Sequence, residues 1–585
     1  MFRLSSLFGA LAVALAVSIC GAAVAQTQNE ILGAWHGTLT SRNNAASTVL
    51  LTVRKGPDGA LEAGFSQPFS GLTAEVPVSN ISVKDGTLDF SIARANAAFE
   101  GKWNAGARRW EGVLKRGSIE MPLSLEAGKL PPRAVVAEMD GVWQGSIERN
   151  GGRLRLVLRI ATGGFGTVVA LDSPDQLSYG QEIPVLGRDG DRVRVGDPGT
   201  QLSYDAMLSN DRSSMSGVWK HPGLPDAQVT FTRAAGPVGR FGTDRPQTPK
   251  PPFDYHVEDV NFGNPFEQGV SLAGTLTLPK GKGPFPAAIL IVGSGGNDRD
   301  DTNLGHKTFA VIADHLTRHG VAVLRYDSRG FGGSKGDMAS ASTADLATDA
   351  NSAARYLMSR PEIRKDAIGF VGHSEGGVTA PVAMASNPRI AFLVMLAGPG
   401  EPWTKMLLSQ RRLMRLSQGK SQQELDRTEP LVAAAYRAVA NAGSEEAGIK
   451  ALRPLLTPDT MAALGDAGQD RDVVARQMNG PWTRYLFRYD PAVNLRKIRV
   501  PVLVMIGSLD MQAPPDENLP VLKAALTGSR DVTIKEIPNL NHLFQTAKTG
   551  APGEYADIRE TFAPIALDIM TDWLTKRFVK TQDGR

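Results

Sequence analysis

The stretch Ile368-Gly-Phe-Val-Gly-His-Ser-Glu-Gly-Gly377 gives the clearest indication of how the second half of this chain folds. Mostly apolar residues lead into Gly372, Ser374 follows, and two glycines precede a small, helix-compatible run over 378–385. This order predicts a strand, a sharp turn and a helix, with the pattern G-x-S-x-G at the turn. A serine on such an elbow needs glycine neighbours, because the backbones pass too close for a Cβ. With a strand before it and a helix N-terminus behind it, Ser374 is predicted to be a nucleophile rather than part of an ordinary turn.

The residues around this elbow alternate between strand and helix patterns. Apolar runs typical of strands buried on both faces of a sheet cover 287–292, 321–326, 368–371, 392–396, 500–506 and 532–537. Helical patterns lie between them at 306–319, 343–359, 375–386 and 518–527, and a last one covers 560–578. The run 270–278 alternates like an antiparallel edge strand. We therefore predict an α/β fold, with a mostly parallel sheet that helices cover on both faces.

Length and composition limit the classes of partner. A chain of 585 residues is too long for one core, and three or four domains are expected. Hydrophobic residues make up 42% and charged residues 21%, and 64 basic against 60 acidic residues give a formal charge of +4. Because no basic run stands out, we expect no nucleic-acid partner.

Residues 1–25 are typical of a signal peptide. Arg3 supplies a positive start, an apolar run covers 4–19, and Ala23-Val-Ala25 fits the small-x-small cleavage pattern. The apolar run is shorter than a membrane span, so we expect cleavage before Gln26 rather than an anchor. Cys20 is the only cysteine, so the mature chain would form no disulfides. We predict an exported protein, periplasmic or secreted, with no transmembrane segment in the mature chain.

The region 26–235 has a different character. Short alternating runs at 48–53, 88–92 and 154–160 predict strands with one buried face, and Asp85-Gly86 and Asp189-Gly-Asp191 predict hairpin turns. Gly33-Ala-Trp-His-Gly-Thr-Leu39 is similar to Gly141-Val-Trp-Gln-Gly-Ser-Ile147, which places matching tryptophans at 35 and 143. We interpret 26–130 and 131–235 as two copies of an all-β module. The modules would either hold a ligand of the cell envelope or, as we prefer, pack against the C-terminal domain. Residues 236–252 are rich in proline and glycine and are predicted to be a linker to a domain at 253–585.

Five motifs resemble those of one enzyme family. They are Gly293-Ser-Gly-Gly-Asn-Asp-Arg-Asp300, Arg325-Tyr-Asp-Ser-Arg-Gly-Phe-Gly-Gly-Ser334, Gly372-His-Ser-Glu-Gly-Gly377, Gly507-Ser-Leu-Asp510 and Asn541-His-Leu-Phe544. With these motifs in this order, the chain from about 255 to 580 resembles the alpha/beta hydrolases, and in particular the exported bacterial carboxylesterases of the EstD-like kind. The resemblance implies an alpha/beta-hydrolase sheet, a Ser-His-acid mechanism on small-molecule carboxylic esters, and no metal or organic cofactor.

Chain order then identifies the partners of the nucleophile. The fold that the resemblance implies places nucleophile, acid and histidine in that order along the chain. His542 is the only histidine after Ser374, so it is the predicted base. Asp510, three residues beyond Gly507, is the predicted acid, whereas Asp516 lies past Pro514-Pro515 and Asp490 is expected to cap a turn before Pro491. Ser374 would attack the carbonyl, His542 would transfer its proton, and Asp510 would orient the imidazole.

An oxyanion hole requires two backbone donors. The N–H of Glu375 would be one, and Ser294 or Gly295 in the loop 293–296 would supply the other. Asp327 and Arg329 are expected to brace the turn after their strand rather than to act in catalysis.

A helix-rich insertion separates the strands predicted at 392–396 and 500–506. Its helices are expected at 403–416, 421–440, 444–452 and 470–478. We predict that about 400–485 form a helical cap over Ser374 that shapes the acyl pocket and excludes water. Six side chains could line that pocket, but packing between cap helices is their more frequent role, so we do not assign them to the site: Met406, Leu407, Met414, Trp482, Tyr485 and Phe487.

The preferred function is an exported serine hydrolase that cleaves small or medium acyl esters through an acyl-enzyme on Ser374. One alternative is a serine exopeptidase or amidase of the same fold. An amine-anchoring cluster of carboxylates in the cap would favour it, and no compact cluster is evident in the sequence. The other alternative is an envelope-binding protein with a vestigial hydrolase domain, against which the intact set Ser374, Asp510 and His542 argues.

Overall fold

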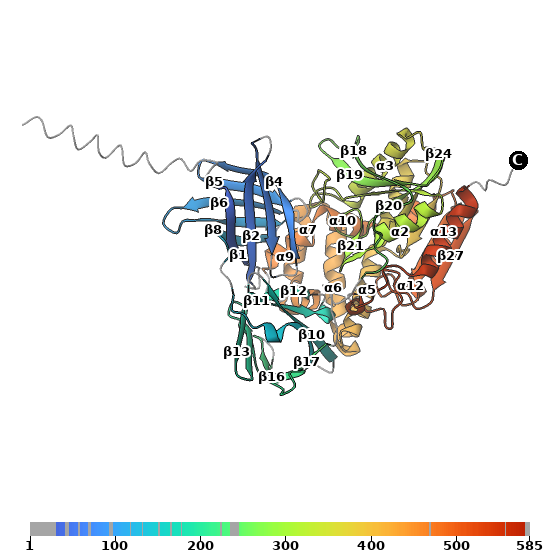
Figure 1. Cartoon of the computed structure of the whole chain (residues 1–585). Coiled ribbons are helices and arrows are strands. Elements are labelled where there is room, and N and C mark those ends of the chain that lie inside the picture. Colours follow the sequence, from blue (N-terminus) through green and yellow to red (C-terminus); the bar gives the residue numbers. More distant parts are fainter. Residues whose placement is uncertain are drawn as a thin grey trace, which may run out of the picture. The chain divides into compact units, whose positions relative to one another are not determined.

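The computed structural model describes residues 31–579 except 41–45, 57–58, 68, 70–71, 93–96, 117–118, 131–132, 150–151, 164–165, 177, 223–224, 235–244, 467–469 and 556. The predicted signal peptide with Cys20, and residues 236–244 of the predicted linker, lie outside the described residues. Figure 1 shows two all-β parts followed by a part in which helices surround a third large sheet.

The first part is a closed barrel of strands β1 to β8 in chain order. β1 pairs antiparallel with both β2 and β8, which closes the barrel. Inward-facing side chains fill its interior, among them Trp35, Phe90, Phe99 and Trp110, each at most 4% exposed. The strands are β1 Gly33–Thr40, β2 Ala46–Lys55, β3 Leu61–Gln67, β4 Leu72–Lys84, β5 Thr87–Ile92, β6 Ala97–Asn104, β7 Arg109–Arg116 and β8 Ile119–Ala127.

The second part repeats this plan with one interruption. Its sheet has the order β12-β11-β10-β9-β17-β16-β15-β14-β13, so β9 pairs with β17 as β1 pairs with β8. The sheet ends at β12 and β13, and the strand in the matching place of the barrel, β4, has a register shift between Ser79 and Ser82. The strands are β9 Gly141–Arg149, β10 Gly152–Gly163, β11 Gly166–Ser173, β12 Ser178–Ile183, β13 Val185–Asp189, β14 Arg192–Asp197, β15 Leu202–Leu208, β16 Ser214–Lys220 and β17 Ala227–Arg233.

Each of the two parts contains a tryptophan that makes the same kind of hydrogen bond. The indole Nε1 of Trp35 donates to the carbonyl of Ile31 at 2.7 Å, and Nε1 of Trp143 donates to the carbonyl of Met139 at 2.8 Å. Each tryptophan thus bonds to the residue four positions before it. The shared strand order and this bond agree with the predicted duplication.

The third part contains an eight-stranded sheet of order β18-β19-β23-β20-β24-β25-β26-β27. β18, β19 and β23 pair antiparallel with one another, and all pairs from β23 to β27 are parallel, as predicted. The strands are β18 His256–Gly263, β19 Ser271–Leu278, β20 Phe285–Ile291, β23 Ala322–Tyr326, β24 Ile363–His373, β25 Leu393–Leu396, β26 Val502–Gly507 and β27 Val532–Ile537, with a separate short pair β21 Thr302–Asn303 and β22 His306–Lys307.

The prediction of an edge strand at 270–278 is wrong in one respect. β19 is antiparallel as expected, but it lies between β18 and β23, and all its residues except Ser271 are buried. The edge strand is β18, which the sequence did not reveal because Glu258 and Asp259 interrupt its apolar pattern.

Helices cover both faces of this sheet and explain its apolar strands. On one face, Phe309 and Ile312 of α2 and Trp573 of α13 pack into a common core. On the other, residues of α3, α4 and α12 pack against the strands. Strands covered on both sides have no polar face, which is why they are continuous apolar runs. The helices are α2 Thr308–Arg318, α3 Thr343–Ser359, α4 Gly376–Ser386, α11 Ala492–Leu495, α12 Pro515–Ala525 and α13 Pro564–Phe578.

The insertion after β25 is helical, close to the predicted bounds. Its apolar side chains form a core of their own that includes Val378 of α4, so the cap packs on the helix behind Ser374. The cap helices are α5 Trp403–Ser417, α6 Gln422–Asn441, α7 Glu445–Leu452, α8 Pro458–Leu464, α9 Arg471–Gln477 and α10 Pro481–Arg488. Within the described residues, no helix is long and apolar enough to cross a membrane.

The described end of the predicted linker is bound to the C-terminal domain. The Arg245 guanidinium donates to the carbonyls of Ile558 at 2.6 Å and Leu304 at 2.9 Å. The Gln247 amide donates to the carbonyl of Phe562 at 2.8 Å and accepts from its N–H at 3.1 Å. Residues from 245 onward therefore belong structurally to this domain.

Candidate active site

Ser374 sits on the sharp turn that the sequence predicts between β24 and α4. Its φ of +54° is in the left-handed region that non-glycine residues rarely adopt, and its N–H donates to the carbonyl of Leu396 at 2.8 Å. A Cβ on Gly372 would lie 2.1 Å from the carbonyl oxygen of Gly376, and one on Gly376 would lie 2.2 Å from that of Ile291. These close approaches are the physical reason for the glycines on both sides of the serine.

His542 and Asp510 form a buried pair at the carboxyl end of the sheet. Nδ1 of His542 lies 3.0 and 2.9 Å from the two carboxylate oxygens of Asp510. Because a carboxylate can only accept, Nδ1–H is the donor and Nε2 is left as the basic nitrogen. Oδ1 of Asp510 also accepts from the main-chain N–H groups of Gln512 and Ala513, both at 2.8 Å. The side chain that orients His542 is therefore itself fixed.

The other acids considered from the sequence lie elsewhere. Asp516 is exposed in the first turn of α12. Oδ1 of Asp490 accepts from the N–H of Ala492 at 2.9 Å, which is the turn-capping contact expected before Pro491. Of the three candidates, the structure brings only Asp510 to His542.

The backbone around Glu375 and Ser294 is suited to bind a developing negative charge. In the described part of the chain, the main-chain N–H groups of Glu375, Ser294 and Gly295 donate no hydrogen bond, so they are available to a ligand. Ser294 lines the cavity that holds Ser374, whereas Gly295 is not among the lining residues. The lining thus places the Ser294 backbone at the cavity, but Glu375 is also not a lining residue, so Gly295 stays the alternative second donor.

An ion pair connects the loops that contain the first two motifs, 293–300 and 325–334. Arg299 forms a two-pronged ion pair with Asp327, at 3.1 Å from Nε and 2.7 Å from Nη2, and Asp327 also accepts from the N–H of Gly333. Arg329 is 1% exposed and pairs with Asp349 at 2.8 and 3.0 Å. Asp327 and Arg329 thus brace the loops, as predicted.

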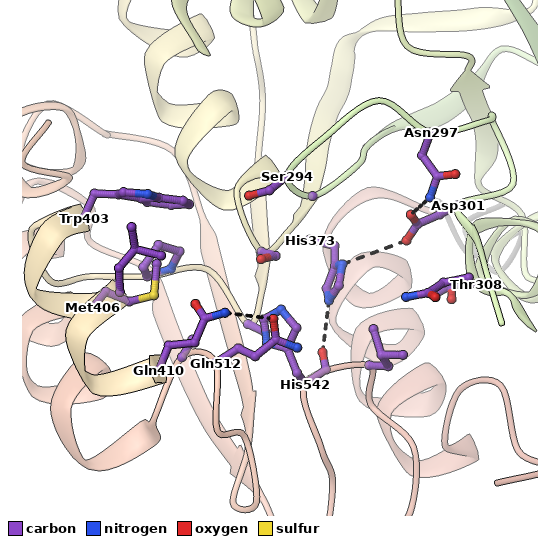
Figure 2. A pocket seen from close by; sticks show the side chains of 18 of the residues that line it. Ser294, Asn297, Asp301, Thr308, His373, Trp403, Met406, Gln410, Gln512 and His542 are labelled. Carbon is purple, nitrogen blue, oxygen red and sulfur yellow. Dashed lines mark hydrogen bonds and ion pairs between the residues drawn. The ribbon is translucent and has the colours of Figure 1, made fainter. Parts of the chain in front are cut away.

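Ser374 and His542 line one cavity of about 350 Å³ beneath the cap. Figure 2 shows Trp403, Met406 and Gln410 on one side of it, with Asn297, Asp301 and Thr308 on the other. Of the cap side chains considered from the sequence, Met406, Leu407 and Trp482 line the cavity, but Met414, Tyr485 and Phe487 do not. The lining residues are Gly293, Ser294, Asn297, Asp301, Asn303, Thr308, His373, Ser374, Ala397, Pro399, Trp403, Met406, Leu407, Gln410, Trp482, Gln512, Ala513, His542, Leu543 and Tyr555.

Sequence reasoning missed two polar residues of this cavity, His373 and Asp301. Nε2 of His373 lies 3.0 Å from the carbonyl oxygen of His542, and burial lowers the pKa of its imidazole to about 4. Asp301 has a φ of +52°, and burial raises the pKa of its carboxyl to about 6. His373 precedes the nucleophile directly, and Asp301 directly follows the first motif. The position of His373 inside the Ser374 motif, and of Asp301 directly after the first motif, was the only signal for these residues.

The side chain of Glu375 also has a role that the sequence did not reveal. It is 1% exposed, and Nε1 of Trp482 in the cap donates to both carboxylate oxygens at 2.9 Å. Oγ1 of Thr343 donates to Oε1 at 2.8 Å. Burial raises the pKa of this carboxyl, and hydrogen bonds from Thr343, Trp482 and Ser294 oppose the rise. Glu375 thus links the elbow to the cap and to the loop that contains Ser294.

Among the described residues, no group of three or more His, Cys, Asp or Glu side chains is arranged to hold a metal ion. The cavity lining supplies the Ser374 hydroxyl and the His542 imidazole, and Asp510, which is not itself in the lining, contacts Nδ1 of that imidazole. These are the groups of acyl-transfer chemistry.

Comparisons with known proteins find similar sequences and solved structures for part of this chain. Residues 305–546 match the family described as serine aminopeptidase, S33. Esterase EstD of Thermotoga maritima is 26% identical over 361 residues, which cover 60% of this chain and 74% of that protein. Among solved structures, the alpha/beta hydrolase GrgF from Penicillium sp. sh18 has 18% identity and a TM-score of 0.35, over 56% of this chain and 100% of its own. The Pyrococcus furiosus esterase Pf2001 has 14% identity and a TM-score of 0.35, over 56% of this chain and 92% of its own. From its sheet, the family match and the similarity to EstD, the C-terminal domain of this chain has the α/β-hydrolase fold and is similar to an esterase.

Proposed function

We propose that this chain hydrolyses carboxylic esters of small or medium acyl groups through an acyl-enzyme on Ser374. The observation that carries the proposal is the buried His542–Asp510 pair, at 2.9 Å, whose His542 lines the same cavity as the strained Ser374. His542 Nε2 takes the proton of Ser374 as Oγ attacks the carbonyl, and then delivers it to the leaving alkoxide. Water repeats the sequence to release the acid. Asp510 holds the tautomer that leaves Nε2 basic and stabilises the imidazolium.

The negative charge of the tetrahedral intermediate would be received by the N–H groups of Glu375 and Ser294. Removing one such donor in a serine hydrolase reduces transition-state stabilisation by about 2.7–4 kcal/mol, so the Ser294 loop should matter nearly as much as the triad. Gly295 stays the alternative second donor.

Cleavage of peptide or amide bonds is the second candidate, because the matching family is described as serine aminopeptidase. An exopeptidase needs carboxylates to hold the substrate amine. The cap contributes Trp403, Met406, Leu407, Gln410 and Trp482 to the described cavity lining, and none of these is acidic. Asp301, outside the cap, is the one acidic residue of the described lining, and a single carboxyl is not the cap cluster that would favour the exopeptidase.

The decisive experiment combines labelling with two substrate classes. A fluorophosphonate probe should label the wild type and not Ser374→Ala, and p-nitrophenyl butyrate should be cleaved faster than aminoacyl p-nitroanilides. Faster amide cleavage would establish the exopeptidase instead. A folded wild type that is not labelled would favour an envelope-binding protein with a vestigial hydrolase domain.

Export is a separate part of the proposal and rests on the sequence of residues 1–25. N-terminal sequencing of the protein from its natural cells should find Gln26 first. A mature chain that begins at Met1 would refute export by this signal. A ligand of the envelope for the two β modules also stays a prediction.

A further inference from the structure

The cavity at Ser374 has two unlike arms. Trp403, Met406 and Leu407 of the cap line the first, which is mostly apolar and has the Gln410 amide as a polar group from the cap. Asn297, Asp301, Thr308 and His373 line the second, which is polar (Figure 2), and Asn303 also belongs to the cavity lining. No lysine or arginine is among the described lining residues. The polar arm is therefore suited to a neutral or cationic group and not to an anion.

The hydrogen-bond partner of His373 determines which of its ring nitrogens carries the hydrogen. Nε2 lies 3.0 Å from the carbonyl oxygen of His542, which can only accept, so Nε2 carries the hydrogen. Burial keeps the imidazole neutral near pH 7, with a pKa of about 4. Nδ1 of His373 is therefore a hydrogen-bond acceptor.

Asp301 places a second acceptor beside it. Oδ1 of Asp301 accepts from the Asn297 amide at 2.7 Å, whereas Oδ2 lies 3.9 Å from Nδ1 of His373, too far for a hydrogen bond. Within the described chain, no group donates to Oδ2. Two acceptors thus lie side by side in the cavity lining without a donor from the described chain, and a ligand that carries a donor can bind to them.

This acceptor pair adjoins the reacting atoms. A Cβ built on Gly293 would lie 3.2 Å from Cβ of Ser374 and 3.8 Å from Nδ1 of His373. His542 and Leu543 also line the cavity, and the hydrogen bond of His373 to the His542 carbonyl ties the acceptor pair to the backbone of the proposed base. Because the leaving alcohol receives its proton from His542, it should lie on this side, and the acyl chain in the apolar arm.

We propose that Asp301 and His373 form a subsite for the alcohol part of the substrate, and that this subsite binds a hydrogen-bond donor, either a hydroxyl or an ammonium group. The inference rests on the proposed ester hydrolysis and adds the class of alcohol. Esters of polyols or of amino alcohols are then better substrates than esters of plain alkyl alcohols.

Matched butyrate esters test this. 2,3-Dihydroxypropyl butyrate is compared with 2-methylbutyl butyrate, and 2-(dimethylamino)ethyl butyrate with 3-methylbutyl butyrate, each pair having nearly the same shape. The wild type should prefer the donor-bearing ester of at least one pair about tenfold or more in kcat/KM, and the preferred pair tells hydroxyl from ammonium. Asp301→Asn should remove the preference, because its amide can keep the bond from Asn297 while a donor replaces the acceptor in the cavity.

Asp298→Asn is the matched control. Asp298 is in the same loop and accepts from main-chain N–H groups of that loop, but it does not line the cavity, so its variant should keep the wild-type ratio. Fluorophosphonate labelling of Ser374 reports that each variant is folded. A wild type that cleaves all four esters without preference, or a preference that survives in Asp301→Asn, overturns the subsite and leaves the esterase standing.

If the wild type cleaved none of the four esters, the proposed function would fail and the subsite would be tested by binding. Glycerol or 2-dimethylaminoethanol should then protect Ser374 from the fluorophosphonate better than 2-methylbutanol or 3-methylbutanol does. Equal protection in both pairs would overturn the subsite.

Discussion

Truncation of the Glu375 side chain tests how the elbow, the cap and the Ser294 loop are held together. In Glu375→Ala, Nε1 of Trp482 and Oγ1 of Thr343 both lose their acceptor. Leaving a buried donor unsatisfied costs about 1–3 kcal/mol each. Burial raises the pKa of Glu375, so the ionised carboxylate destabilises the folded state. Its removal in Glu375→Ala therefore offsets part of the stability lost with the two hydrogen bonds. We expect the free energy of unfolding to fall by about 2–4 kcal/mol.

Glu375→Gln separates hydrogen bonding from charge. Oε1 of Glu375 accepts from both Thr343 and Trp482, so an amide oxygen in that place can keep both bonds. The amide NH2 would replace Oε2, which also accepts from Nε1 of Trp482 at 2.9 Å, so only this second contact is lost. We therefore expect a loss below about 1.5 kcal/mol for this variant. Glu446→Ala, at an exposed cap residue, is the control and should stay within about 0.5 kcal/mol.

The raised pKa of Glu375 also predicts how the Gln variant responds to pH. The protonated carboxyl is favoured in the folded state, so its contribution is present below the unfolded pKa of 4.5 and is lost as the pH rises through the folded value. The stability of Glu375→Gln relative to the wild type should thus increase from pH 4 towards neutrality.

Activity should follow the same contacts, because Trp482 and Ser294 both line the cavity. Glu375→Ala should reduce kcat/KM for p-nitrophenyl butyrate at least tenfold, which is about 1.4 kcal/mol, and Glu375→Gln should lose less. Urea unfolding of Glu375→Ala, Trp482→Phe and the double variant measures the coupling directly. Losses that add within about 0.5 kcal/mol would refute a link through this carboxyl.

Three further predictions concern the site and the domain boundary. Asp510→Asn should lower kcat by about 10⁴-fold, because the amide selects the wrong histidine tautomer, while the far-UV circular dichroism stays unchanged; a loss below tenfold would remove Asp510 from the mechanism. Burial raises the folded-state pKa of Asp301 from 3.8 to about 6, so the wild type should lose stability relative to Asp301→Asn as the pH rises between these values. The loss should reach up to about 3 kcal/mol. A difference in thermal unfolding between the two proteins that does not change with pH would contradict this. A chain that begins at Arg245 should retain kcat/KM within about tenfold of the full chain. A chain that begins at Phe253 loses the Arg245 and Gln247 contacts and should melt at a lower temperature. Soluble but ester-inactive protein from 245 onward would show that the β modules complete the site.

The sequence by itself determined the elements of the C-terminal domain and three of its proposed catalytic side chains. The period of apolar residues predicted the strands and helices, because a strand buried on both faces and a helix buried on one have different repeats. The glycines around Ser374 predicted the elbow, since their contacts of 2.1 and 2.2 Å leave no room for side chains. Chain order selected His542, since no other histidine follows Ser374.

Only the tertiary structure decided what surrounds those residues. β18 is the edge strand on the antiparallel side of the sheet although its acidic residues hide the pattern, because only Val260 and Phe262 of this strand are buried. The choice between Ser294 and Gly295, the cap side chains that reach the cavity, and the Glu375–Trp482 contact depend on where separate loops and helices meet. Asp301 and His373 are far apart in the sequence, and neither belongs to a spacing that chemistry requires. The periodicity that predicts a strand or a helix involves residues close together in the sequence. The depth, charge and hydrogen bonding of a cavity depend instead on contacts between residues up to hundreds of positions apart.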